Sequence, residues 1–136
     1  RAAGAHPYFI PVEHTARARS ILGPDPLLAP EVAVVLETDP TGARALAREY
    51  ASIYLGLPNY TQNLRTFGFD DGDIDGGGSD RLIDAVIPWG DAATIAGRIG
   101  EHHSAGADHV CVQVISEGGR HGFPLAEYRE LAAALL

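Results

Sequence analysis

The four residues His6, Pro7, Tyr8 and Phe9 combine an imidazole with two aromatic rings close to the start of the chain. A planar ring ligand is held by flat apolar walls and by a few hydrogen-bonding groups at its polar edge, and this stretch supplies both. A ring cofactor carries its own reactive chemistry, so such a site needs no nucleophile. We therefore predict that these four residues contact a cofactor. The alternative for His6 is a histidine that caps the end of a strand.

Two polar residues belong to the carboxyl ends of the other predicted strands. Glu37 ends the apolar run 31–37, and Gln113 lies in the apolar run 109–115. Ligands in barrels of parallel strands meet the carboxyl ends of those strands, so we predict that both residues face a substrate. Glu37 is either a base or simply the polar end of its strand.

The segment 56–69 interrupts the alternation of strands and helices, and we place its residues Asn59 and Tyr60 on the substrate side. Inserted segments near strand ends often shape a binding site. The aromatic rings of Tyr60, Phe67 and Phe69 are equally suited to forming the core of the insertion itself. Asn59 is also suited to capping a helix that begins there.

The acidic, glycine-rich segment 70–78 begins like a calcium-binding loop. Asp71, Asp73 and Asp75 occupy the first, third and fifth positions of an EF-hand pattern. The twelfth position is Leu82, where the pattern requires a bidentate glutamate. We predict a flexible, solvated acidic loop, with weak calcium binding as the alternative.

The six histidines and the single cysteine do not indicate a metal centre. His102 and His103 are adjacent, so on a helix their side chains point about 100° apart and do not readily share an ion. Cys111 stands inside an apolar run, which is typical of a small buried side chain. We predict no metal site.

The charge of the chain argues against several classes of partner. Lysine and arginine together number 10 against 18 acidic residues, a net charge of -8, which opposes binding to nucleic acid or to anionic lipid headgroups. No apolar run approaches the ~20 residues of a membrane span, and the N-terminus lacks the apolar region of a signal peptide. We expect a cytoplasmic protein with a small-molecule substrate and with neither nucleic acid nor membrane as a partner.

Strand and helix patterns alternate along the 136 residues. Strands are predicted for three short apolar runs, 5–9, 31–37 and 109–115. Helices are predicted between and after them, at 12–22, 40–57, 59–67, 80–87, 92–103 and 124–136, with caps at Asp39, Ser79 and Asp91. The prolines of residues 24–30 predict a stiff connector. A βα order repeated about three times predicts an α/β fold with a parallel sheet.

A parallel sheet of three strands, apolar on both faces, has two exposed edges and too few helices to cover it. An eight-stranded (β/α)8 barrel takes about 250 residues, so residues 1–136 supply less than half of one by strand count. We therefore predict a single domain that forms the C-terminal part of a (β/α)8 TIM barrel, about three βα units with a helical insertion. We expect a homo-oligomer formed through the exposed sheet edges.

Four segments, taken in order, resemble one protein family. They read GAHPYFIPVEHTARARSILGP, LLAPEVAVVLETDP, YLGLPNYTQNLRTFGF and WGDAATIAGRIGEHHSAGADHVCVQV. Together they are similar to the C-terminal half of the bacterial luciferase-like flavin-dependent monooxygenases, and in particular to the actinobacterial deazaflavin-dependent oxidoreductases. The resemblance covers nearly the whole chain.

The resemblance implies a luciferase-like (β/α)8 barrel whose coenzyme, coenzyme F420 or alternatively FMN, lies across the C-terminal mouth of the strands. It implies hydride transfer between that coenzyme and an organic substrate. It also implies that the first strands of the barrel and a glycine-containing phosphate loop precede residue 1, so we expect residues 1–136 alone to be inactive. A stand-alone module that self-associates or binds calcium weakly is the alternative.

Overall fold

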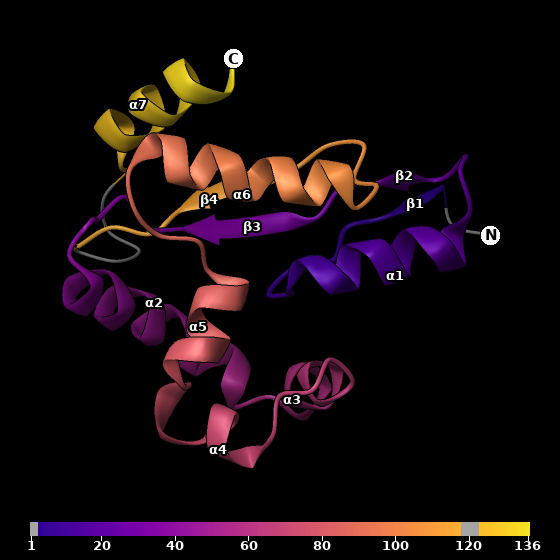
Figure 1. The fold of residues 1–136 in the computed structure, drawn as a ribbon, viewed down its shortest axis with the longest axis horizontal. Helices are drawn as coiled ribbons and strands as arrows, with labels where there is room; N and C mark the ends of the chain where they lie inside the picture. Colours follow the sequence, from indigo (N-terminus) through magenta and orange to yellow (C-terminus); the bar gives the residue numbers. More distant parts are fainter. Residues whose placement is uncertain (1–2, 118–122) are drawn as a thin grey trace.

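The computed structural model describes residues 3–117 and 123–136 and shows a mixed α/β fold (Figure 1). Four short strands form two parallel pairs, β1 (Gly4–Ala5) with β2 (Leu27–Leu28) and β3 (Glu31–Val34) with β4 (Cys111–Val114). The strands among these described residues do not close into a barrel.

The two pairs are joined through one extended segment, residues 27–35, which contains both β2 and β3. On one side its backbone N–H groups donate to the N-terminal strand, from Leu27 to Ala3, from Ala29 to Ala5 and from Glu31 to Pro7, at 3.1, 3.0 and 2.9 Å. On the other side the segment accepts from the C-terminal strand, at Pro30 from Cys111 and at Val34 from Ile115, at 2.9 and 2.8 Å. These three parallel segments lie in chain order, as the βα repeat predicts. A fourth segment, residues 88–90, pairs in parallel with Val35 on the side of β1 and so lies out of that order.

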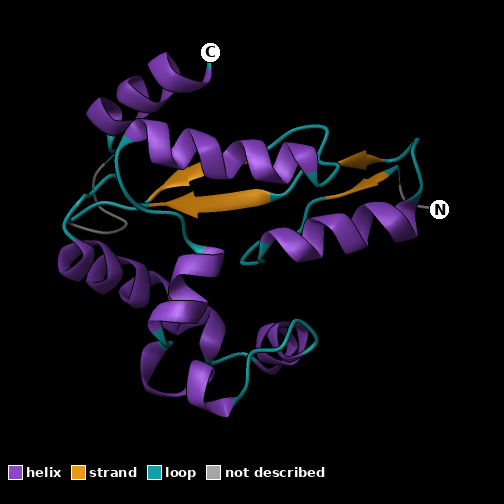
Figure 2. Cartoon of the chain, in the orientation of Figure 1, coloured by secondary structure: helices purple, strands orange, loops and turns teal. Residues whose placement is uncertain are grey.

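Helices lie on both sides of these strands (Figure 2). They are α1 (Val12–Leu22), α2 (Pro40–Leu55), α3 (Pro58–Arg65), α4 (Asp71–Ile74), α5 (Asp80–Val86), α6 (Ala92–Ser104) and α7 (Leu125–Leu135), with a 3-10 turn, η1 (Asp75–Gly77), after α4. In the view of Figures 1 and 2, α6 and α7 lie above the strands and α2 to α5 lie below them.

Local capping explains where α2, α5 and α6 begin. The Asp39 carboxylate accepts from the Gly42 N–H at 2.8 Å at the start of α2, and the Asp91 carboxylate accepts from the Thr94 N–H at 2.8 Å at the start of α6. The Ser79 hydroxyl accepts from the Leu82 N–H at 3.1 Å and begins α5. These three predicted caps are confirmed. Each accepts from an N–H group of the first helical turn, which has no backbone partner within the helix.

Strand β3 is buried on both faces, as the apolar run 31–37 predicts. Val32, Val34 and Val114 pack with Ile95 and Ile99 of α6 in one apolar cluster. Val35 points the other way, into a second cluster that contains alanines of α2 and much of α5, namely Ala43, Ala47, Ala51, Leu82 and Ile83. Helix α2 thus lies on the opposite face of the sheet from α6.

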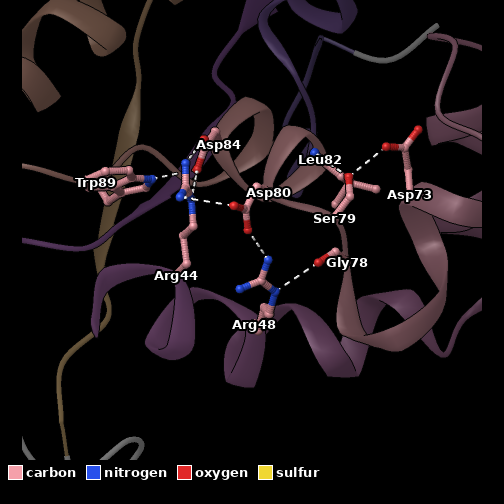
Figure 3. A network of polar contacts seen from close by, with 9 residues as sticks. All are labelled: Arg44, Arg48, Asp73, Gly78, Ser79, Asp80, Leu82, Asp84 and Trp89. Atoms are coloured by element: carbon pink, nitrogen blue, oxygen red, sulfur yellow. Dashed lines mark hydrogen bonds and ion pairs between the residues drawn. The ribbon is translucent and has the colours of Figure 1, made fainter. Parts of the chain in front are cut away.

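A network of arginines and aspartates fixes α2 against α5 (Figure 3). Arg44 donates to both oxygens of Asp84, at 3.0 and 2.6 Å, and lies 3.1 Å from Asp80. Arg48 donates to the Gly78 carbonyl at 2.9 Å and pairs with Asp80. The Trp89 indole donates to Asp84 at 2.7 Å, so the segment that follows α5 is tied to the same carboxylate. The pair formed by Arg44 and Asp84 is bidentate, the geometry that fixes a guanidinium most firmly.

Several sequence predictions need correction. The strand predicted at 5–9 is regular only at Gly4–Ala5, because Pro7 has no N–H for the ladder and Tyr8 forms only an isolated bridge with Glu31. It is also half open, with 40% of Tyr8 exposed. The connector 24–30 contains β2, since its residues pair with β1. The predicted flexible loop 70–78 is instead helical in α4 and η1, where Asp70 and Asp73 form a reciprocal capping box.

None of the described helices combines the length and the apolar character that a membrane crossing requires.

Candidate functional site

The two faces of the sheet differ in chemistry because side chains alternate along each strand. The register of β3 and β4 pairs Glu31 with Cys111 and Ala33 with Gln113, and a parallel bridge pairs Tyr8 with Glu31. Paired residues point to the same face. We call this the polar face, and it is defined by His6, Tyr8, Glu31, Cys111 and Gln113. The valines of β3 and β4 occupy the opposite face.

Five aromatic rings gather over the polar face, and we call them the aromatic cluster: Tyr8, Phe9, Tyr50, Tyr54 and Tyr60. Tyr54 of α2 is at its centre. The Phe9 ring stacks on Tyr54 with centroids 4.7 Å apart and planes at 15°, and the Tyr60 ring meets Tyr54 edge-on at 5.0 Å. Tyr8 contacts the rings of both Tyr54 and Tyr60, at 5.9 and 5.6 Å. The cluster supplies the flat apolar walls that a ring ligand needs.

Phe9 has an unusual backbone conformation. Its φ of 53° is the one positive value among the described residues other than glycine, and its side chain is 5% exposed. A bulky residue in this region is strained by about 1–3 kcal/mol, and such strain is concentrated at functional sites. Here it follows the bridge of Tyr8 with Glu31, and the phenyl ring stacks on Tyr54.

The tyrosine hydroxyls form a chain that ends on β4. The Tyr50 hydroxyl donates to Gln113 Oε1 at 3.1 Å and lies 3.0 Å from the Tyr54 hydroxyl, which is therefore the donor of that pair. Burial, reinforced by the hydrogen bond with Tyr54, raises the pKa of Tyr50, and burial together with the Tyr8 hydroxyl raises the pKa of Tyr60 to about 12. Both hydroxyls thus stay protonated at neutral pH and serve as hydrogen-bonding groups.

His6 and Glu31 form a second polar group at the other side of the polar face. His6 Nδ1 lies 2.6 Å from the Ala29 carbonyl oxygen, and His6 Nε2 lies 3.8 Å from Glu31 Oε2. The His6 side chain is 52% exposed and that of Glu31 is 28% exposed. Both groups can therefore contact a ligand directly.

A pocket of about 270 Å³ opens beside the aromatic cluster at the carboxyl end of β4, lined by Tyr50, Tyr54, Gln113 and Ile115 among others. A hollow of about 570 Å³ adjoins it, shares Leu46, Ile115 and Ser116, and extends to Glu37. Both spaces lie where the parallel strands β3 and β4 end, the position at which α/β folds bind ligands.

A groove of about 650 Å³ between α1, α5 and α6 lies away from the polar face. Most of its charged groups are engaged, since Arg98 pairs with Glu101 at 2.5 Å and Asp84 accepts from Arg44 and Trp89. We assign no chemistry to this groove because Glu13 is the one charged residue of its lining that has no partner among the described residues.

Most of the residues predicted for a site come together. His6, Tyr8, Phe9 and Tyr60 belong to the polar face or to the aromatic cluster, and Gln113 joins them through Tyr50. Pro7 lies between His6 and Tyr8 and uses its carbonyl to accept from the Glu31 N–H at 2.9 Å.

Two predicted residues lie apart from this group. Asn59 is exposed within the first turn of α3, where Leu57 is the capping position, so its predicted role as a helix cap is wrong. Pro58 takes the first helical position and moves the start of α3 one residue earlier. Glu37 accepts from the Asp39 N–H at 2.8 Å and borders the larger hollow rather than the aromatic cluster.

Sequence reasoning missed Glu31, Tyr50 and Tyr54. The two tyrosines are four residues apart on the apolar stripe of α2, which indicates that they share a face but not that this face meets the sheet. Glu31 opens an apolar run and carries no signal of its own in the sequence. Only the strand register places it beside His6.

The acidic residues of segment 70–78 serve within the fold. Asp73 is 8% exposed and accepts from Ser79 at 2.6 Å and from Arg81, while Asp71 pairs with Arg65 at 2.5 Å. The hydrogen bonds from Arg81 and Ser79 lower the pKa of Asp73 to about 2. Within residues 3–117 and 123–136, no three side chains of histidine, cysteine, aspartate or glutamate are grouped so as to hold a metal ion.

Searches of protein-family models, of curated proteins and of solved structures find no match to this chain.

Proposed function

We propose that this chain is the C-terminal sector of a luciferase-like (β/α)8 barrel oxidoreductase and that its polar face contacts the ring of coenzyme F420, or alternatively of FMN. One observation carries the proposal. Three parallel segments present His6, Tyr8, Glu31 and Gln113 on a single face, and a pocket lined in part by Gln113 lies at the carboxyl end of β4. Valines and helix α6 cover the opposite face, as valines and helices cover the outside of a barrel, whereas α2 packs on the polar face.

The chemistry of this face fits a flavin-type ring. The Tyr54 ring, backed by the buried Phe9 ring that stacks on it, offers a flat wall, and the Gln113 amide and the His6 imidazole offer hydrogen bonds to a polar edge. The arginines of α2 are paired with carboxylates of α5, so they are not available to a phosphate. We therefore assign to this chain contacts with the ring and not with the phosphate of the coenzyme.

In this proposal the residues of the chain bind and orient rather than react. The coenzyme, when bound, supplies hydride transfer to an organic substrate. The aromatic cluster excludes water from one side of the ring, and the hydroxyls of Tyr50 and Tyr54 hold Gln113 in a fixed orientation. Positioning of this kind is most of what a protein contributes to such a reaction, so residues 1–136 alone should not turn over substrate.

The test is a titration of the chain with lumiflavin, a flavin ring without phosphate, followed by backbone NMR shifts. We expect saturable shifts at Tyr8, Tyr54 and Gln113, and about tenfold weaker binding in Tyr54→Leu. Tyr128→Leu is the matched control, because Tyr128 packs with the apolar cluster on the opposite face. Absence of saturable shifts at the polar face would rule out the proposed ring contacts.

We also propose that the chain self-associates through β1. In a parallel pair the backbone groups of alternate residues point outward, and no described element bonds to the outer side of Gly4, His6 or Tyr8. The outer edge of β4 is partly closed, since the Val114 N–H donates to the Tyr128 hydroxyl at 3.2 Å. One open edge on each copy favours a closed dimer over a filament.

Light scattering of the eluting peak in size-exclusion chromatography measures this self-association. A dimer has twice the 14.4 kDa mass of one chain. A monodisperse monomer at every concentration tested would show that the β1 edge does not pair.

A further inference from the structure

Pro7 leaves one carbonyl of the central segment without its partner in the ladder. The N–H groups of Ala29 and Glu31 donate to Ala5 and Pro7, at 3.0 and 2.9 Å. In a parallel ladder this spacing directs the Ala29 carbonyl toward the N–H of residue 7. Proline has no N–H, so the ladder cannot supply that donor.

The side chain of the preceding residue takes its place. His6 Nδ1 lies 2.6 Å from the Ala29 oxygen, within hydrogen-bond distance. A carbonyl oxygen only accepts, so Nδ1 must carry the proton in this contact. The hydrogen bond therefore sets the tautomer of His6, and in the neutral ring Nε2 is left with its lone pair free.

The free nitrogen lies on the polar face next to Glu31. Nε2 is 3.8 Å from Glu31 Oε2, and the His6 side chain is 52% exposed, so a ligand can reach it. The rings of Tyr8 and Tyr60 lie on the same side of the sheet, and their centroids are 5.6 Å apart. Their flat surfaces would hold a planar ligand with its polar edge toward Nε2.

We propose that His6 is a specificity-determining residue whose Nε2 accepts a hydrogen bond from an N–H or O–H group on the edge of a planar ligand, and that Pro7 fixes it in this state. The proposal rests on the proposed function, and it names the atom and the ligand group involved. An imide N–H flanked by two carbonyls, as at the pyrimidine edge of a flavin-type ring, is the class of group that it selects. The missing N–H of Pro7 and the Ala29 carbonyl set the tautomer of His6, so this tautomer should be present whether or not a ligand is bound.

The tautomer is tested first, without any ligand. Two-bond 15N–1H spectra of the imidazole at pH 8 should show His6 with its proton on Nδ1. In Pro7→Ala the backbone N–H returns to donate to Ala29, so His6 should shift toward the Nε2-protonated form that predominates in free histidine. Pro24→Ala, an exposed proline of the connector, should leave the spectrum unchanged. A wild-type His6 protonated on Nε2 would overturn the proposal.

The ligand group is tested second, with lumiflavin and its N3-methyl analogue, which lacks the imide N–H. We expect the wild-type chain to bind lumiflavin about tenfold more tightly, the ratio that one net hydrogen bond provides. His6→Asn keeps an N–H donor for Ala29 but has no Nε2, so it should fold normally and lose this preference. Equal binding of the two compounds would overturn the role of His6 while leaving the proposed function intact. Binding of neither compound would reject the proposed function, and the tautomer result would still stand.

Discussion

Thr15 Oγ1 lies 2.9 Å from His102 Nδ1, and both side chains are buried between α1 and α6, with 0% and 2% of their surfaces exposed. This contact joins residues 87 positions apart. It holds α1 against α6, the helix that covers the face of the sheet opposite the polar face. An imidazole in such a place is neutral, because burial disfavours its charged form.

The first prediction concerns acid stability. Burial, with a smaller contribution from Arg98, lowers the pKa of His102 from 6.5 to about 4. The unfolded chain therefore binds this proton more readily than the folded one. The free energy of unfolding should be fully retained above pH 6.5 and should fall by up to about 3 kcal/mol as the pH drops toward 4. Urea unfolding at a series of pH values measures this slope.

The change of the unfolding free energy with pH is compared between two variants, His102→Gln and the control His103→Gln. His103 is exposed one position further along α6, so its replacement should leave the slope unchanged, whereas replacing His102 should flatten it. An equal slope in wild type and His102→Gln would show that His102 is not the group responsible.

The second prediction concerns the close approach of β1 and β2. A Cβ atom added at Gly4 would lie 2.3 Å from the Leu27 carbonyl oxygen, a backbone atom that cannot move aside without breaking the ladder. Gly4→Ala should therefore lower the unfolding free energy by about 1–3 kcal/mol. Gly97→Ala in α6, where an added Cβ meets nothing within 4 Å, should instead raise it by about 0.5–1 kcal/mol. Chemical denaturation measures the unfolding free energy of both variants. An unchanged unfolding free energy in Gly4→Ala would contradict the pairing of β1 with β2.

The third prediction concerns the aromatic cluster at high pH. Because the pKa of Tyr60 is raised to about 12 and that of Tyr50 is raised further, at least two of the five tyrosines should remain protonated at pH 11 while the chain stays folded. Unfolding should release them to titrate near pH 10, so stability should fall as the pH rises above 10. Phenolate absorbance measures the ionised fraction, and Tyr60→Phe should remove one late-titrating group. Titration of all five near pH 10 in the folded chain would show that the cluster is open to water.

The fourth prediction concerns the helical turn that replaces the expected acidic loop. In Asp73→Asn the carboxylate that accepts from Arg81 and Ser79 is lost, and with it the charge that Arg81 neutralises. Amide exchange should accelerate at Ile74 and Ser79, whose N–H groups are bonded within this turn. Asp75→Asn, which alters an exposed residue of the same segment, should leave exchange unchanged. Rapid exchange of Ile74 and Ser79 already in the wild type would mean that the segment is a flexible loop after all.

The boundaries of several helices follow from the sequence because their signals are local. Pro11 and Gly23 bracket α1, and Asp39 and Asp91 begin α2 and α6 where the residue types predict. A cap acts over three or four residues, so its effect can be read without knowledge of the rest of the chain. The failure at 70–78 is different, since the capping box of Asp70 and Asp73 is a local signal that the sequence prediction overlooked, and Arg81 outside the segment reinforces it.

The sequence by itself determined the alternation of strands and helices, the parallel order of the segments and the side chains available for a site, because these follow from periodicity and residue type. Only the tertiary structure decided that Glu31 lies beside His6 and that Tyr50 reaches Gln113, 63 residues away. Those contacts depend on the register of paired strands and on the face to which α2 packs, and a shift of one residue in register would turn each side chain to the other face.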